Sequence, residues 1–280
     1  MNSTGLGGPM ETILREPAVA GSFYPGSGPA LARELEQLVK VSEGRHDLLA
    51  CIAPHAGYMY SGGVAGELYG HLEVPRRVIV LGPNHSGIGA RVAVAPHRRW
   101  RTPLGEQPLD VELAAMVEEK LPDASFDQNA HWREHSLEVQ LPFLLARQPQ
   151  VEIVPICLGH LGLDESLDLG KSLANLIEDL GENVGIVASS DMSHYLPDEQ
   201  ARTLDRMAID AAVERDPKKL YQTVHREGIT MCGVVPATVA IEAANRLGAN
   251  DAHLVTYATS GDASGDRSAV VGYAGICVHK

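Results

Sequence analysis

The chain has 280 residues, 44% of them hydrophobic, and a formal net charge of −13 at pH 7. This length fits one large domain or two small ones and can bury a sizeable core. The acidic balance, with no basic cluster longer than HRRWR at 97–101, argues against nucleic-acid binding. No apolar run approaches the ~18 residues that suggest a membrane span.

The first residues are rich in glycine, serine and threonine and lack a secretion-signal pattern. We predict a flexible N-terminal tail over residues 1–14, a single domain over residues 15–280, and a cytoplasmic location. The four cysteines lie far apart and form no C-x-x-C pair, so we expect reduced thiols and no disulfide framework.

Helical and strand-like patterns alternate along the rest of the chain. Leucines at helical spacing predict a helix from Pro29 to about Val39. Apolar runs predict strands at 48–53, 77–81, 92–95, 151–158, 184–188, 253–259 and 269–278. Further helices are expected at 62–71, at 131–147, where an internal proline predicts a kink or a late start, at 235–247, from Pro217, and after the capping residues Asp110, Asp164 and Asp198. The alternation predicts an α/β fold with one mixed, mostly parallel sheet, helices on both faces and an antiparallel final pair of strands.

Three of the predicted strands end in loops that present a histidine. His55 follows the strand at 48–53, and His85 follows the strand at 77–81. His194 follows the strand at 184–188, with Asp191 three residues before it. Ligands of open α/β sheets bind beyond the carboxyl ends of the strands, so parallel neighbours would bring these side chains to one rim. We therefore predict a shared site, whereas a single histidine would more simply be a hydrogen-bonded loop residue.

Cys232 precedes a predicted helix in the segment TMCGVVP. A thiol near a helix N-terminus has a lowered pKa and makes a good soft ligand or nucleophile. The alternative is an inert, buried position, which is the usual state of a free cysteine. The other three cysteines lie in strand-like runs and are assigned to the core.

A rival pattern occupies residues 131–135, where HWREH fits the H-x-x-E-H motif of inverted zinc proteases. On a helix, His131 and His135 would share one face, and Glu134 could polarise a water molecule. The motif is short and nothing marks a third ligand. A polar helix N-terminus, with Glu134 and Glu138 in its first turn, explains the same residues.

Six segments occur in the order PAVAGSFYP, APHAGYMYSG, LGPNHSG, EHSLEVQLPFL, SSDMSHY and TMCG. Together they resemble the Memo-like family, also called AmmeMemoRadiSam system protein B, from about Pro17 to the last residue. That family is similar to the class III extradiol dioxygenases. The resemblance implies a single α/β domain with helices flanking a mixed sheet.

The resemblance also implies a metal site. His55 and His85 match the two metal-binding histidines of the dioxygenases, and His194 matches their acid/base histidine, with Asp191 beside it. Cys232 falls where Memo-like proteins carry a cysteine as third ligand, in place of the dioxygenase carboxylate. A thiolate softens the site, so Fe(II) is the first expectation and Cu or Zn are the alternatives.

By this resemblance the chain is a metal-dependent oxidoreductase of extradiol-dioxygenase type that acts on a small aromatic substrate. A non-enzymatic protein that binds a metal or a peptide, with AMMECR-type and radical-SAM proteins as partners, is a second hypothesis. A zinc-dependent hydrolase is a third. Neither a nucleic acid nor a membrane is an expected partner.

Overall fold

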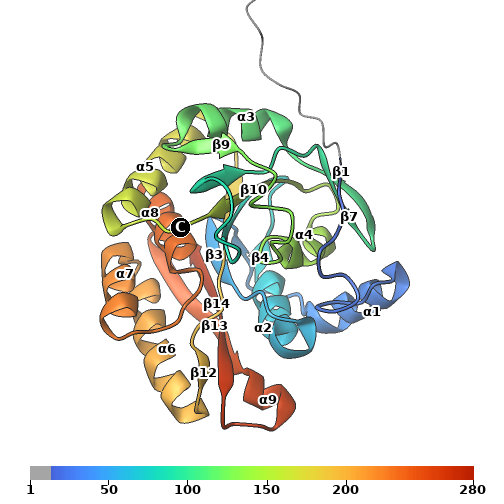
Figure 1. Ribbon diagram of the computed structural model, residues 1–280, viewed down its shortest axis with the longest axis vertical. Coiled ribbons are helices and arrows are strands. Elements are labelled where there is room, and N and C mark those ends of the chain that lie inside the picture. The colour runs from blue at the N-terminus through green and yellow to red at the C-terminus, as the bar shows by residue number, and fades with distance from the viewer. Residues whose placement is uncertain (1–13) are drawn as a thin grey trace, which may run out of the picture.

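The computed structural model describes residues 14–280, and Figure 1 shows how its elements are arranged. The tail predicted for residues 1–14 lies outside the described residues, except for Leu14, which already pairs in strand β1 (Leu14–Arg15). The predicted α/β class is confirmed, because a large mixed sheet is flanked by helices. Within residues 14–280, no helix has the length and apolar character needed to cross a membrane.

Four parallel strands form the centre of the large sheet. Their order is β3 (Ala50–Ala53), β11 (Val184–Ser189), β5 (Arg77–Pro83) and β10 (Glu152–Leu158). Apart from Arg77, Glu152 and Ser189 at their ends, these strands contain no polar side chain, because helices cover both faces. The flanking strands are β14 (Val270–His279), β13 (Asp251–Thr259), β12 (His194–Leu196), β6 (Val92–Val94) and β9 (Ala124–Phe126). β13 and β14 pair in antiparallel orientation, as predicted.

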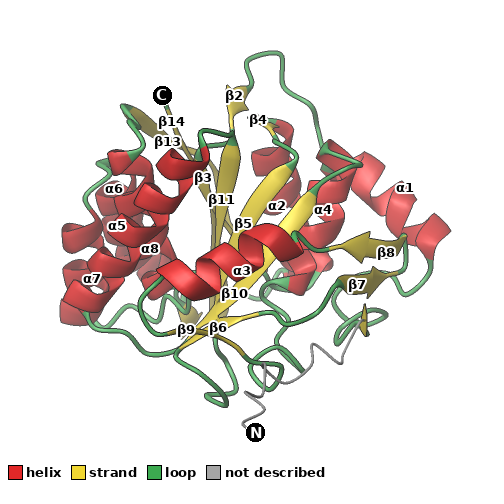
Figure 2. Cartoon of the chain, turned by 90° about the horizontal axis from the view of Figure 1, so that it is seen from above, coloured by secondary structure: helices red, strands yellow, loops and turns green. Residues whose placement is uncertain are grey.

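The helices divide between the two faces of the sheet (Figure 2). Ile79 and Leu81 of β5 pack on the side of α3 (Val111–Lys120), α5 (Leu163–Leu180), α6 (Asp198–Val213), α7 (Pro217–Arg226) and α8 (Val234–Arg246). Val78 and Val80 pack on the side of α1 (Gly28–Leu38), α2 (Tyr58–Gly70) and α4 (Leu141–Arg147). The alternation of side chains along β5 therefore feeds two cores, one on each face.

Smaller elements complete the described chain. A three-stranded sheet joins β1 to β7 (Arg99–Thr102) and β8 (Gly105–Pro108). A two-stranded sheet joins β2 (His46–Asp47) to β4 (Leu72–Glu73), and the short helix α9 (Ser260–Ser264) links β13 to β14.

One of the three predicted helix caps is confirmed. The Asp110 side chain accepts the N–H of Leu113 at the start of α3. Asp164 lies inside the first turn of α5, where Gly162 holds the cap position, and Asp198 is the first residue of α6. Aspartate is favoured at both the cap and the first turn, so the local sequence does not separate these positions.

The helix predicted for residues 131–147 starts late, which was one of the two effects expected of its internal proline, and its first half is wrong. Residues 131–137 form turns, a single 3₁₀ turn spans Glu138–Gln140, and α4 starts at Leu141 with Pro142 in its first turn. Glu138 and Gln140 are buried, and both bond to distant segments. These tertiary bonds hold the segment out of a helix and place its polar side chains inside the protein.

Candidate metal centre

Neighbouring parallel strands bring three of the predicted site residues to one rim of the sheet. β11 lies between β3 and β5. The loops that follow these strands carry His55, Asp191 and His85, in that order across the sheet. These strands therefore end at one rim, and the turn at 131–137 brings His135 to the same place. His194, which was predicted to share this site with His55 and His85, lies in β12 and is not one of the three histidines whose ring nitrogens come together.

Three imidazoles converge at this rim. The ring centroid of His55 lies 5.3 Å from that of His85 and 5.5 Å from that of His135. His85 and His135 stack with their centroids 4.7 Å apart and their planes at 16°. One ring nitrogen from each histidine lies within 4.8 Å of the others, so the group could hold a metal ion.

The surrounding hydrogen bonds fix the tautomer of His55. Its Nδ1 lies 2.9 Å from the Ser189 hydroxyl oxygen. That hydroxyl donates its own proton to the Ser136 carbonyl at 2.7 Å, so His55 Nδ1 carries the hydrogen and Nε2 keeps its lone pair. Burial, and the proximity of His135 and His85, hold the pKa of His55 well below its usual range. His55 is thus a neutral imidazole with a ligand nitrogen facing the site.

Glu134 orients His85 in the same sense. Its carboxylate accepts His85 Nδ1–H at 2.9 Å, the His85 backbone N–H at 2.9 Å and the Ser136 N–H at 2.8 Å. Burial opposes protonation of His85, but the bond to Glu134 outweighs it, and the pKa of His85 is raised. Burial alone would raise the pKa of Glu134, yet its hydrogen bonds lower it to about 2. A histidine that donates Nδ1–H to a carboxylate and keeps Nε2 free is the usual arrangement around a metal.

Cys232 lies against His55. Its Sγ is 3.3 Å from His55 Nε2 and accepts the Asp191 backbone N–H at 3.3 Å. The cysteine immediately precedes the N-cap of α8, but burial first, and then the charge of Asp191, raise the pKa of the thiol. The lowered pKa expected from the helix terminus is wrong for the metal-free protein, because the loss of hydration outweighs the helix dipole.

Asp191 and His194 have separate partners. Asp191 Oδ1 accepts the His55 backbone N–H at 2.7 Å, and burial raises the Asp191 pKa to about 7. His194 Nδ1 lies 3.0 Å from the Thr230 carbonyl, which can only accept, so Nδ1 is protonated and Nε2 is free. Thr230, and not the neighbouring Asp191, thus orients His194. Asp191 instead fixes the loop that carries His55.

His131 takes no part in the cluster. It is fully buried, and its Nε2 lies 3.0 Å from the Ala93 carbonyl oxygen. Because residues 131–135 form turns and no helix, His131 and His135 do not share a face. The inverted zinc-protease pattern is therefore broken, although two of its members, Glu134 and His135, belong to the site.

Glu138 anchors the N-terminal segment beside the site. Its buried carboxylate pairs with Arg15 at 2.6 Å and accepts the Tyr24 hydroxyl at 2.6 Å. Tyr58 donates its hydroxyl to the Val139 carbonyl at 2.8 Å, and the Phe23 ring meets His135 edge-on at 4.9 Å. The prediction of a first-turn carboxylate at Glu138 missed this clamp. The only sequence signal for it was a charged residue within the largely apolar run LEVQLPF, which also contains Gln140.

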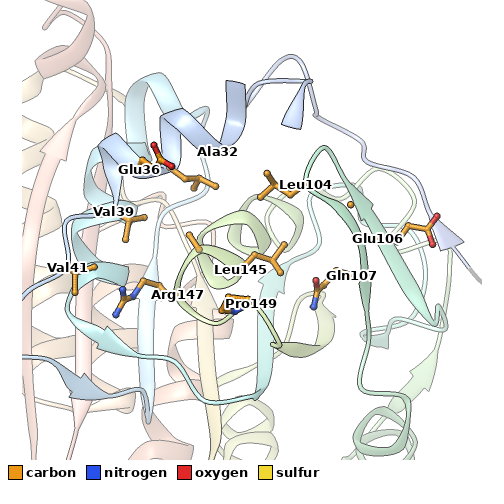
Figure 3. Close-up of a pocket in the computed structure, with 13 residues that line it drawn as sticks. Ala32, Glu36, Val39, Val41, Leu104, Glu106, Gln107, Leu145, Arg147 and Pro149 are labelled. Atoms are coloured by element: carbon orange, nitrogen blue, oxygen red, sulfur yellow. The ribbon is translucent and has the colours of Figure 1, made fainter. Parts of the chain in front are cut away.

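A separate cavity of about 640 Å³ lies between α1, the β7–β8 hairpin and the end of α4 (Figure 3). Leu35, Val39, Leu104 and Leu145 supply much of its apolar lining, with Glu36 and Arg147 at its edge. None of its lining residues belongs to the histidine cluster.

Fold and site together define an α/β protein whose central strands carry a histidine cluster that could hold a metal ion. The sequence profile described as Memo-like protein matches residues 15–277. Proteins named MEMO1 family protein are 43% identical in Aquifex aeolicus and 42% identical in both Methanosarcina mazei and Archaeoglobus fulgidus. These alignments cover 94–95% of this chain and 98–99% of each relative. The chain belongs to the Memo-like family.

Proposed function

We propose that this protein is a non-haem iron oxidoreductase of extradiol-dioxygenase type. His55 Nε2, His85 Nε2 and Cys232 Sγ are its proposed metal ligands. The observations that carry the proposal are the two Nε2 lone pairs, each fixed by a bonded Nδ1–H, and the thiol that lies 3.3 Å from His55 Nε2. Copper and zinc are the alternative metals for this donor set.

The distance between His55 and Cys232 suits two ligands of one ion, while Cys232 lies outside the group of His55, His85 and His135, whose ring nitrogens are within 4.8 Å of one another. With bonds of about 2.0–2.1 Å to nitrogen and about 2.3 Å to sulfur, an N···S edge is about 3.1 Å at a right angle and about 3.6 Å at the tetrahedral angle. The distance of 3.3 Å between His55 Nε2 and Cys232 Sγ lies between these values. His135 adds a third imidazole, which offers a further donor position beside His85.

When bound, the ion supplies Lewis acidity and a binding position for O₂ and a chelating substrate. The residues of the protein would supply proton transfer and the positioning of the ligands. His194, held by Thr230, has a free Nε2 that can accept a substrate hydroxyl proton and return it. Asp191 holds the backbone of His55 and so fixes the position of that ligand.

The rim of the site suits a small aromatic substrate or the side chain of a peptide. Met59, Ile88 and Tyr195 are large, exposed apolar residues within four residues in sequence of His55, His85 and His194, whereas Trp132 lines a separate cavity with Arg15 and His97. Exposed apolar side chains gathered around polar donors are typical of binding sites.

Metal analysis of the anaerobically purified protein, loaded with Fe(II), tests the ligand set. We expect His55→Ala and His85→Ala each to lose one equivalent of iron relative to the parent, and Cys232→Ala to lose most of it. His131→Ala is the matched control, because that histidine bonds to Ala93, and it should keep the iron. Unchanged iron in the His55 and His85 variants would refute the proposed centre.

Turnover is tested with catechols in air-saturated buffer. The proposal predicts a coloured ring-opened product and the uptake of one O₂ per product. His194→Ala should keep its iron and lose turnover; loss of iron there would mean that His194 is a ligand. Bound iron without turnover of any catechol would favour the non-enzymatic hypothesis, in which AMMECR-type or radical-SAM proteins are the partners.

A further inference from the structure

A second histidine cluster lies at the opposite end of the large sheet. His46 is in β2, just before β3, while His253 is near the start of β13 and His279 is at the end of β14. β14 runs antiparallel to β3, with Val278 paired to Ala50, so the end of β14 lies at the start of β3. In the first cluster, His55 and His85 follow the other end of β3 and of its parallel companion β5. The two clusters are therefore separated by the length of the central sheet.

The three rings of the second cluster are in mutual contact. His46 and His279 stack with centroids 3.7 Å apart, and His253 meets both edge-on, at 5.2 Å from His46 and 5.4 Å from His279. One ring nitrogen from each lies within 4.8 Å of the others. The ring nitrogens of the first cluster lie within the same distance of one another.

Two of the nitrogens are at the distance of two ligands on one ion. His279 Nδ1 lies 3.1 Å from the Lys280 carbonyl oxygen, so Nδ1 is protonated and Nε2 carries the lone pair. That Nε2 faces His253 Nδ1 at 3.3 Å. With metal–nitrogen bonds of about 2.0–2.1 Å, the N···N edge of a tetrahedral zinc site is about 3.3 Å. The Nδ1–H···O=C bond is also the usual support of a metal-binding imidazole.

A carboxylate lies beside the cluster, outside the group of three donors that are within 4.8 Å of one another. Asp251 Oδ2 lies 3.7 Å from His279 Nε2, and the Asp251 side chain is largely exposed. His46 and His279 also line a cavity of about 510 Å³, which provides a route for an ion and for water.

We propose that His46, His253 and His279, with Asp251 as the fourth donor, form a second metal site that binds Zn²⁺ or a divalent ion with the same preference for imidazole. Such an ion would tie β2 to the β13–β14 hairpin, although β2 itself pairs with β4. The site is independent of the proposed oxidoreductase centre, with which it shares no residue.

Zinc titration of the chelator-treated, full-length protein tests this site. The measurement uses a His55→Ala/His85→Ala background, so that the first cluster does not contribute. We expect one equivalent of Zn²⁺ to bind by calorimetry, and Co²⁺ to give the visible absorption of a four-coordinate site. At 100-fold excess over the dissociation constant, Zn²⁺ should raise the melting temperature by about 5–10 °C.

The variants separate this site from adventitious binding. In the same background, His253→Ala and His253→Gln should each weaken zinc binding at least 100-fold, and Asp251→Asn about 10-fold. His160→Ala removes an exposed histidine elsewhere and is the matched control. Melting curves in chelator check that each variant is folded, and His253→Gln keeps a polar side chain of similar size. The inference is overturned if the background protein binds no zinc, or if the His253 variants bind it as tightly as His160→Ala.

Discussion

Replacing Glu134 by Gln tests whether the first cluster is built to bind metal. The Glu134 carboxylate accepts three N–H groups, two at Oε1 and one at Oε2. The amide oxygen of Gln can replace Oε1, but its NH₂ group must then face the His85 backbone N–H. The bond from the His85 backbone N–H to the carboxylate is lost, and the new NH₂ group opposes that N–H, so that two donors face each other. The residue is only 3% exposed, so little water can reach these groups.

The loss should appear in metal affinity. Removal of a carboxylate that supports a ligand histidine costs 10–100-fold in affinity, which is about 1.4–2.7 kcal/mol. The pKa of His85 should also fall, because the charge that raises it is gone. The assay is competition of the Fe(II)-loaded or Zn(II)-loaded protein with a chelator, in a His253→Gln background so that only the first cluster reports. Histidine resonances followed by NMR give the pKa.

The dependence of the free energy of unfolding on acidic pH is an independent test of the role of Glu134. The folded-state pKa of Glu134, about 2, lies below its ordinary value of 4.5. Its ionised form therefore contributes stability that is fully present above about pH 4.5 and is lost as the pH falls toward 2, on the order of 3 kcal/mol. In Glu134→Gln, the free energy of unfolding should therefore fall less steeply between pH 4.5 and pH 2. Glu165→Gln, which alters an exposed carboxylate paired with Arg91, is the control. In the chelator competition, a metal dissociation constant of Glu134→Gln within threefold of the parent value would refute the supporting role of Glu134.

Three further perturbations have defined outcomes. The pKa of Asp191 is raised to about 7 from 3.8, so its ionisation costs stability as the pH rises through this window, and Asp191→Asn should be more stable at pH 8 by up to about 4 kcal/mol in urea unfolding; an unchanged pH profile would contradict this. Gly82→Ala would place a Cβ 2.5 Å from Ser136 Oγ, so it should lower the free energy of unfolding by about 1–3 kcal/mol and weaken metal binding. Gly63→Ala in α2 places its Cβ in open space and should raise the free energy of unfolding by about 0.5–1 kcal/mol. Equal melting temperatures for the two variants would argue against the packing account. Glu138→Gln leaves the buried Arg15 unpaired and should destabilise by about 3–5 kcal/mol in denaturant unfolding; a loss below 1 kcal/mol would show that this ion pair is not a structural clamp.

Local pattern sufficed for the central architecture. The apolar runs that became β3, β5, β10 and β11 are visible in the sequence because both faces of these strands are buried. Parallel strands direct their carboxyl ends to one rim, and by this rule we grouped His55, His85 and His194, whereas the structure brings Asp191 to the rim between His55 and His85. The Pro29 and Asp110 helix starts followed from local backbone chemistry alone.

Tertiary structure decided the partners of these residues. Local sequence favoured a helix at 131–147, but the contacts of Glu134, Glu138 and Gln140 with segments about 50 to 120 residues away hold part of it in turns. The same contacts bring His135 into the cluster and turn His131 away to Ala93. The raised pKa of the Cys232 thiol likewise depends on burial, which no short segment reveals.

The second histidine cluster separates most clearly what local sequence predicts from what tertiary structure decides. His46, His253 and His279 are more than 200 residues apart at their extremes and belong to no common motif. They meet because β14 returns antiparallel to β3, which places the end of one strand beside the start of the other. Sequence periodicity predicts which residues form strands and which are buried. Only the pairing of distant strands fixes which imidazoles come within reach of the same ion.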